Sequence, residues 1–205
     1  ALSSLAAREP GLSHYAASKR MGEQVLIEEA KRIQWMALRP PAVYGPGDTE
    51  LLPLFRAMAK GFAPVPGVPD ARFSMLYVDD LAAAVLAWLG SDTTGSGVYT
   101  LEDGHAGGYD WREVADIVTG ICNRRVRLMP VPEWLLDIVA GLNSLAARVL
   151  GYAPMLTPEK LRELRHPDWA CDSEALQAEI DWRPGFGLEA GLRATPGWPG
   201  YRELH

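Results

Sequence analysis

Short apolar runs alternate with stretches of helical periodicity through the first half of the chain, and this alternation restricts the fold class. Gln34–Arg39, Arg72–Val78 and Val98–Leu101 predict buried strands, because strands of a parallel sheet read as continuous hydrophobic runs. Residues 12–31 and 81–89 have the spacing of amphipathic helices. Since strands that alternate with helices build parallel sheets, we expect an α/β protein with a mainly parallel sheet in its first half.

The second half predicts mostly helix and loop, with a short strand at Val126–Met129. Residues 61–71 hold three prolines and two glycines, which favour a loop. The sequence contains these start signals for further helices: Pro53 within 51–60, Asp79 as the cap of 81–89, a capping box at Asp110–Glu113, Thr157–Pro158, and Asp172 or Ser173 before a helix ending near Ile180.

Charge and cysteine spacing exclude two classes of function. The net charge of -6 and the lack of a basic run longer than Arg124–Arg127 argue against a general nucleic-acid binder. Cys122 and Cys171 have no Cys or His partner at metal-ligand spacing, so we expect no metal site. Two reduced thiols are typical of a cytoplasmic protein.

The longest apolar stretch, Trp134–Leu150, is too interrupted to predict a membrane span. It carries Asp137, Asn143 and Arg148, and a span needs about 20 consecutive apolar residues. We interpret it as an amphipathic helix that is either packed against the protein or interfacial. One functional hypothesis is therefore a protein that uses this helix on a lipid or membrane surface.

The spacing of Tyr15 and Lys19 points to proton-transfer chemistry. At i and i+4 of a helix the two side chains share a face. A phenol is a poor base at neutral pH, but a nearby ammonium favours its ionised form and makes it usable as a general acid or base. Ser4, or alternatively Ser3, could donate a hydrogen bond to a substrate oxygen. Because the chain has seven tyrosines, the spacing alone is a weak signal.

Three motifs together make the signal specific. The first is Ser3–Ser4 followed by Tyr15-Ala-Ala-Ser-Lys19 and then Gly22–Glu23; the second is Leu38–Asp48, with Arg-Pro-Pro-Ala-Val-Tyr-Gly-Pro-Gly; the third is Phe73–Ala82, with Val-Asp-Asp-Leu-Ala. In this order they resemble the extended short-chain dehydrogenases/reductases, the NAD-dependent epimerase/dehydratase family. Tail residues resemble its hydroxysteroid dehydrogenase-like branch, among them Asp181–Pro184, Gly191–Leu192 and Trp198.

The resemblance implies a Rossmann-like fold, NAD or NADP as cofactor, a small-molecule substrate, and a role for each matched residue. Tyr15 would be the proton donor and acceptor, and Lys19 would hold the nicotinamide ribose. Ser4, or Ser3, would orient the substrate oxygen. Pro40, Pro41 and Val43 would line the nicotinamide pocket. Arg39 would pair with a carboxylate or face the substrate, and Asp79 and Asp80 would cap a helix.

The family's glycine-rich cofactor loop has no counterpart in these 205 residues. Gly104, Gly107 and Gly108 follow a predicted strand but lack its pattern, so we assign them to a loop. The resemblance implies roughly 100 further residues before Ala1. We therefore expect an incomplete Rossmann-like sheet without its N-terminal strands, which alone binds NAD(P) poorly and forms a homo-oligomer or pairs through an exposed sheet edge.

Two functions from different classes follow. The first is an NAD(P)-dependent oxidoreductase or epimerase/dehydratase that transfers hydride at an alcohol or carbonyl, and the second is a non-catalytic family member that acts as a binding or scaffold protein. We assign residues 1–45 and 72–101 to the dinucleotide-binding part. Residues 46–71 and 102–205 would form a mostly helical substrate-binding part, where substrate choice in this family mainly resides.

Overall fold

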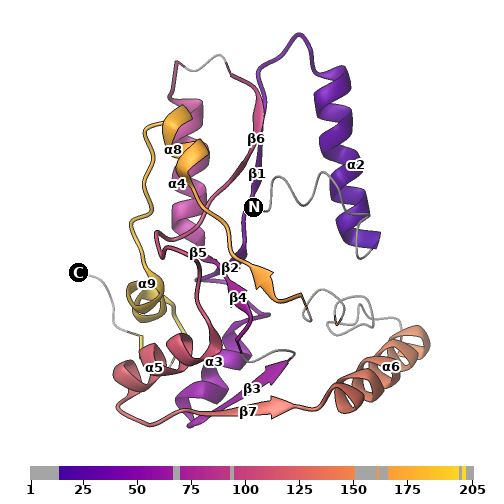
Figure 1. The fold of residues 1–205 in the computed structure, drawn as a ribbon, viewed down its shortest axis with the longest axis vertical. Coiled ribbons are helices and arrows are strands. Elements are labelled where there is room, and N and C mark those ends of the chain that lie inside the picture. Colours follow the sequence, from indigo (N-terminus) through magenta and orange to yellow (C-terminus); the bar gives the residue numbers. More distant parts are fainter. Residues whose placement is uncertain are drawn as a thin grey trace.

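The computed structural model describes residues 14–66, 70–92, 95–150, 161, 166–198 and 200–201. The helices are α2 (His14–Glu29), α3 (Leu52–Ala59), α4 (Val78–Leu89), α5 (Trp111–Cys122), α6 (Glu133–Leu150), α8 (Glu174–Glu179) and α9 (Leu188–Ala194) (Figure 1). The strands are β1 (Met36–Arg39), β2 (Ala42–Tyr44), β3 (Phe62–Pro66), β4 (Arg72–Phe73), β5 (Met75–Tyr77), β6 (Gly97–Thr100), β7 (Arg127–Val131) and β8 (Asp168–Trp169). The Thr157–Pro158 helix start lies outside the described residues.

The named strands of the described chain form four parallel pairs, which confirms the α/β class. β1 pairs with β6 and β2 with β5, so the predicted first-half strands and the unpredicted strand β2 form two parallel ladders. β3 pairs with β7, and β4 with β8. The last two pairs join strands that lie far apart in sequence. The second half of the chain therefore adds strands to the first.

A serine separates the two short strands that occupy the predicted strand Arg72–Val78. β4 pairs with β8 and β5 with β2, so the chain changes partner at Ser74. The Ser74 hydroxyl is buried, donates to the Cys171 carbonyl at 3.3 Å and accepts from the Cys171 amide at 3.0 Å. Burial raises the pKa of the Cys171 thiol to about 11, although the hydrogen bond with Ser74 opposes this shift. The thiol is therefore neutral at physiological pH.

The predicted loop at 61–71 is wrong in its first half, where β3 runs from Phe62 to Pro66. Alternate residues of a strand present their N–H groups to opposite edges. Prolines at 64 and 66 therefore remove donors from a single edge, and the other edge remains free to pair with β7. Proline content indicated a loop, but the spacing of the prolines is compatible with an edge strand.

Two hydrophobic cores position these strands. The first lies among α3, α5, α9 and the ends of β2 and β5, with Tyr44, Met58 and Val118 at its centre. The second joins Leu76, Leu101 and Trp182 beside α4 and α8. Because Trp182 packs with β-strand residues of the first half, the C-terminal tail forms part of the sheet's own core.

The capping box predicted at Asp110–Glu113 is confirmed, since the Asp110 carboxylate accepts from the Glu113 amide at 2.8 Å and the Glu113 side chain accepts from the Asp110 amide. The predicted cap at Asp79 is wrong. Helix α4 begins after Tyr77 without a side-chain cap, and Asp79 is exposed. Asp80 is buried instead, and its carboxylate accepts from the backbone amides of Gly185 at 2.8 Å and Phe186 at 3.0 Å. It therefore binds the C-terminal tail rather than its own helix.

Helix α6 buries two alanines and leaves most of its large apolar side chains exposed. Ala140 and Ala147 are buried. Six large apolar side chains on the same helix are exposed: Trp134, Leu135, Ile138, Val139, Leu142 and Leu145. The helix extends away from the other elements (Figure 1). Across the part of the chain that the structure describes, no helix has both the length and the apolar character needed to cross a bilayer.

Candidate functional site

The first turn of α2 brings Tyr15 and Lys19 together, as their spacing predicts. The Lys19 Nζ lies 5.3 Å from the centroid of the Tyr15 ring, within the range of a cation–π contact. The Tyr15 side chain is 69% exposed, so a ligand has free access to its phenol. The Ser18 hydroxyl donates to the Tyr15 carbonyl at 2.8 Å, which satisfies one backbone group of this turn.

The direction of α2 places this pair at one end of the sheet. The chain reverses between Glu29 and Met36, so α2 and β1 run in opposite directions (Figure 1). The N-terminal end of α2 therefore lies toward the carboxyl end of β1. In open α/β sheets ligands bind outside the carboxyl ends of the strands, so Tyr15 and Lys19 lie at the end where chemistry is expected.

A salt bridge joins the two elements. The Arg39 guanidinium, at the last position of β1, donates to both carboxylate oxygens of Glu23 on α2, with Nε–Oε1 at 2.7 Å and a second bond from Nη2 to Oε2. Their side chains are 23% and 19% exposed. This hydrogen bond raises the pKa of Arg39, while burial opposes the shift. The sequence left two roles open for Arg39, pairing with a carboxylate or facing the substrate. In the structure it pairs with a carboxylate.

The segment after β1 carries the predicted pocket residues Pro40, Pro41 and Val43. Pro40 is exposed, while Pro41 and Val43 are half-buried. The predicted turn that follows is confirmed by a hydrogen bond of 3.1 Å from the Asp48 amide to the Gly45 carbonyl. Gly45 has a φ of 138°, and a Cβ there would lie 2.7 Å from Val78, so only glycine fits. Ser3 and Ser4 lie outside the described residues.

A buried tyrosine cluster lies at the carboxyl ends of β2 and β5. Tyr44 and Tyr77 end these strands side by side, with ring centroids 5.6 Å apart. The Tyr109 hydroxyl donates to the buried Asp103 carboxylate at 2.6 Å. Burial raises the pKa of Tyr44, and also that of Tyr109, where the bond to Asp103 adds to the shift. Both phenols therefore stay neutral at physiological pH and do not act as acids or bases.

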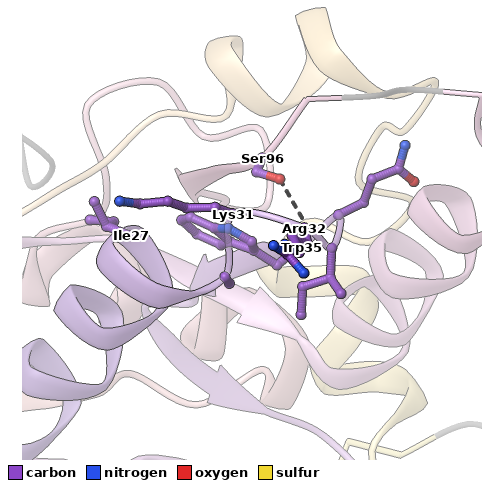
Figure 2. Close-up of a pocket in the computed structure, with 8 residues that line it drawn as sticks. Ile27, Lys31, Arg32, Trp35 and Ser96 are labelled. Atoms are coloured by element: carbon purple, nitrogen blue, oxygen red, sulfur yellow. Dashed lines mark hydrogen bonds between the residues drawn. The ribbon is translucent and has the colours of Figure 1, made fainter.

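A pocket of about 440 Å³ opens at the opposite end of α2 (Figure 2). Its lining includes Lys31, Arg32, Trp35 and Ser96, and the Trp35 amide donates to the Ser96 hydroxyl at 3.2 Å. Trp35 and Ser96 immediately precede β1 and β6. The pocket therefore lies at the amino ends of the strands, away from Tyr15, and we do not assign the chemistry to it.

Reasoning from sequence missed the roles of Glu23, Asp80 and the tyrosine cluster. Glu23 lies four residues after Lys19, and this helical spacing could have suggested a shared face. Asp80 differs from Asp79 only in burial, which has no local signal. Among the described residues, no group of three His, Cys, Asp or Glu side chains is arranged to hold a metal ion.

Comparison with known proteins identifies the relatives. Residues 4–101 match the model of the NAD dependent epimerase/dehydratase family. Ceramide reductase of Caulobacter vibrioides is 36% identical over 205 residues, with 96% of this chain and 60% of that protein covered. An Arabidopsis thaliana 3beta-hydroxysteroid-dehydrogenase/decarboxylase, isoform 2, is 25% identical, with 88% and 34% covered. The chain thus spans less than two thirds of the length of these relatives.

Solved structures share the fold. The UDP-glucose 4-epimerase of Thermus thermophilus, in complex with NAD, has a TM-score of 0.60 at 23% identity, over 91% of this chain and 53% of its own. The UDP-glucuronic acid 4-epimerase of Bacillus cereus, solved with UDP-glucuronic acid and NAD, has a TM-score of 0.62 at 17% identity, over 89% and 51%. At these identities the likeness extends to the fold alone. Through residues 4–101, the chain is thus similar to the NAD-dependent epimerase/dehydratase family, the extended short-chain dehydrogenases/reductases.

Proposed function

We propose that the whole protein catalyses NAD(P)-dependent hydride transfer at an alcohol or carbonyl carbon, with Tyr15 as the general acid and base. The observation that carries the proposal is the Lys19 ammonium 5.3 Å from the ring of an accessible Tyr15, at the carboxyl end of the sheet. A cation at this distance stabilises negative charge on the phenol, which is the charge that develops when Tyr15 releases its proton.

The residues around Tyr15 fit a bound NAD or NADP. The open face of Tyr15 leaves room for a ribose and a substrate, and the Lys19 ammonium can donate to ribose hydroxyls from one turn along α2. Pro40, Pro41 and Val43, whose side chains carry no charge, are proposed to line the nicotinamide on the sheet side. When bound, the nicotinamide supplies or accepts the hydride. Ser4, or Ser3, is proposed to hold the substrate oxygen while Tyr15 exchanges its proton.

Cofactor binding tests the role of Lys19. In the protein as its gene encodes it, Lys19→Ala should weaken NADH or NADPH binding about 10-fold, because charge-assisted hydrogen bonds to the ribose are lost. Titration of nicotinamide fluorescence measures the affinity. Lys60→Ala, a lysine at the end of α3, is the matched control and should bind as the parent does. Equal affinity of the Lys19→Ala variant and its parent would remove Lys19 from the cofactor site.

We propose a lipid alcohol or ketone as the substrate class. Two observations support it: the relatives named above act, by their names, on ceramide and on a hydroxysteroid, and α6 presents six large apolar side chains outward. Chromatography of the products, together with NADH absorbance, should detect turnover of a long-chain lipid ketone and none of a UDP-sugar. Turnover of the UDP-sugar alone would reverse this choice of substrate.

The apolar face of α6 gives a separate test of the lipid hypothesis. The double variant Trp134→Ser, Leu142→Ser should lower co-sedimentation with phosphatidylcholine vesicles about 10-fold or more, since each large side chain contributes roughly 1.5–3 kcal/mol when removed from water. The control is Leu86→Ser, which changes an equally exposed leucine on α4. Vesicle binding that is equal in all three proteins would mean that α6 does not contact lipid.

The alternative is a non-catalytic family member that acts as a binding or scaffold protein. Such a protein has no chemical need for a lysine ammonium over an accessible tyrosine ring, so the geometry of Tyr15 and Lys19 favours the enzyme. The two functions differ in one measurement, because only the enzyme converts a substrate into a product, which chromatography of the reaction mixture detects.

A further inference from the structure

Helix α2 carries the proposed catalytic residues but has little apolar packing of its own. Within its described side chains, 15–29, none is fully buried, and the half-buried residues that face the protein are mainly small or charged. They are Ala16, Ala17, Arg20, Glu23 and Leu26. Leu26 is the only large apolar side chain among them, so few interlocking apolar contacts define the rotation of the helix. Polar contacts therefore help to determine which edge of α2 faces the site.

The bond between Glu23 and Arg39 has the geometry to do this. A guanidinium that donates two parallel hydrogen bonds to one carboxylate fixes orientation as well as distance. Arg39 ends β1, and its side chain is held in a largely enclosed position. A lysine in place of Arg39 would supply only a point charge. A glutamine in place of Glu23 could accept at only one oxygen.

Glu23 lies on the same side of α2 as the proposed catalytic pair. Tyr15, Lys19 and Glu23 follow one another at intervals of four residues, so they form a row along one side of the helix. With a rise of 1.5 Å per residue, Tyr15 lies about 12 Å beyond Glu23 along the helix axis. That distance equals about four residues of extended strand. Because Glu23 contacts the last residue of β1 and α2 runs opposite to β1, Tyr15 lies beyond the end of the strand, in the direction of Pro40, Pro41 and Val43.

We propose that Glu23 and Arg39 form a positioning pair, which sets the rotation and height of α2 and so places Tyr15 and Lys19 at the carboxyl end of the sheet. This role rests on the proposed function. Neither residue touches the reacting atoms. A small rotation of α2 about its axis would displace the phenol sideways by an ångström or more, and a misplacement of 1 Å can lower a rate about 100-fold.

The test uses the protein as its gene encodes it, with three variants: Glu23→Gln, the exchanged pair Glu23→Arg with Arg39→Glu, and the control Glu28→Gln, an exposed carboxylate of the same helix. We expect Glu23→Gln to lower kcat about 100-fold with a change in KM below about threefold, and to speed amide hydrogen exchange of residues 14–29. The exchanged pair should recover at least about a tenth of the parent kcat. Glu28→Gln should match the parent in both measurements.

A kcat within about threefold of the parent for Glu23→Gln would overturn the positioning role, even if the variant melts at a lower temperature. An exchanged pair no better than Glu23→Gln would overturn it too. If Tyr15→Phe is fully active, the proposed function is wrong, but the positioning role of Glu23 and Arg39 is not thereby refuted. Hydrogen exchange then tests the positioning pair by itself. Faster exchange of residues 14–29 in Glu23→Gln that is slowed again in the exchanged pair supports the positioning role. Unchanged exchange in Glu23→Gln overturns it.

Discussion

Replacing Tyr15 with phenylalanine should lower kcat about 1000-fold while changing cofactor affinity by less than about threefold. General acid–base catalysis by a placed side chain contributes roughly 10²–10⁴ in rate, and the substitution removes only the hydroxyl that carries the proton. The ring remains, and with it the face over which the Lys19 ammonium lies at 5.3 Å. Lys19 therefore stays available to the cofactor, which separates the loss of chemistry from a loss of binding.

The measurement is steady-state turnover by NADH absorbance, together with fluorescence titration of the cofactor. Tyr201→Phe is a suitable control, because Tyr201 is also an accessible tyrosine, at 41% exposure, and lies in the C-terminal tail. It should keep the parent's kcat. A Tyr15→Phe variant that retained more than about a tenth of the parent's kcat would mean that another group moves the proton.

Local signals in the sequence predicted the local structure well. The capping box of Asp110–Glu113 places its donor and acceptors within four residues, so the sequence alone contains the whole interaction. The same holds for the Gly45–Asp48 turn and for Tyr15 and Lys19, which meet because a helix brings i and i+4 together. Each of these predictions depended only on backbone geometry over one turn.

The interactions that were not predicted join residues far apart in the chain. Glu23 meets Arg39 across 16 residues, and Asp80 meets Gly185 across 105. No local pattern distinguishes Asp80 from Asp79, because their difference arises only when the tail folds over one of them. The division of the chain into a dinucleotide-binding and a substrate-binding part stays a prediction for the same reason, since it depends on how distant segments share their cores.

Asp80 should be among the most sensitive positions for stability. Replacing it with alanine is expected to lower the free energy of unfolding by roughly 3 kcal/mol, because two hydrogen bonds from backbone amides to a charged acceptor are lost. The loss also releases the tail that packs Trp182 into the second core and Phe186 against Tyr77, with ring centroids 4.5 Å apart.

Urea unfolding followed by tryptophan fluorescence measures the free energy, and Asp79→Ala provides a control of the same chemistry one residue away. Asp79 is exposed and makes no cap, so its removal should change stability by less than about 0.5 kcal/mol. Asp80→Asn keeps one acceptor oxygen and should fall between the two alanine variants. If Asp79→Ala and Asp80→Ala were equally stable, the tail would not be anchored by Asp80, and the packing of Trp182 alone would have to hold it. If Asp80→Ala has a free energy of unfolding lower than that of Asp79→Ala by the expected margin, a single buried carboxylate links the start of α4 to the last part of the chain.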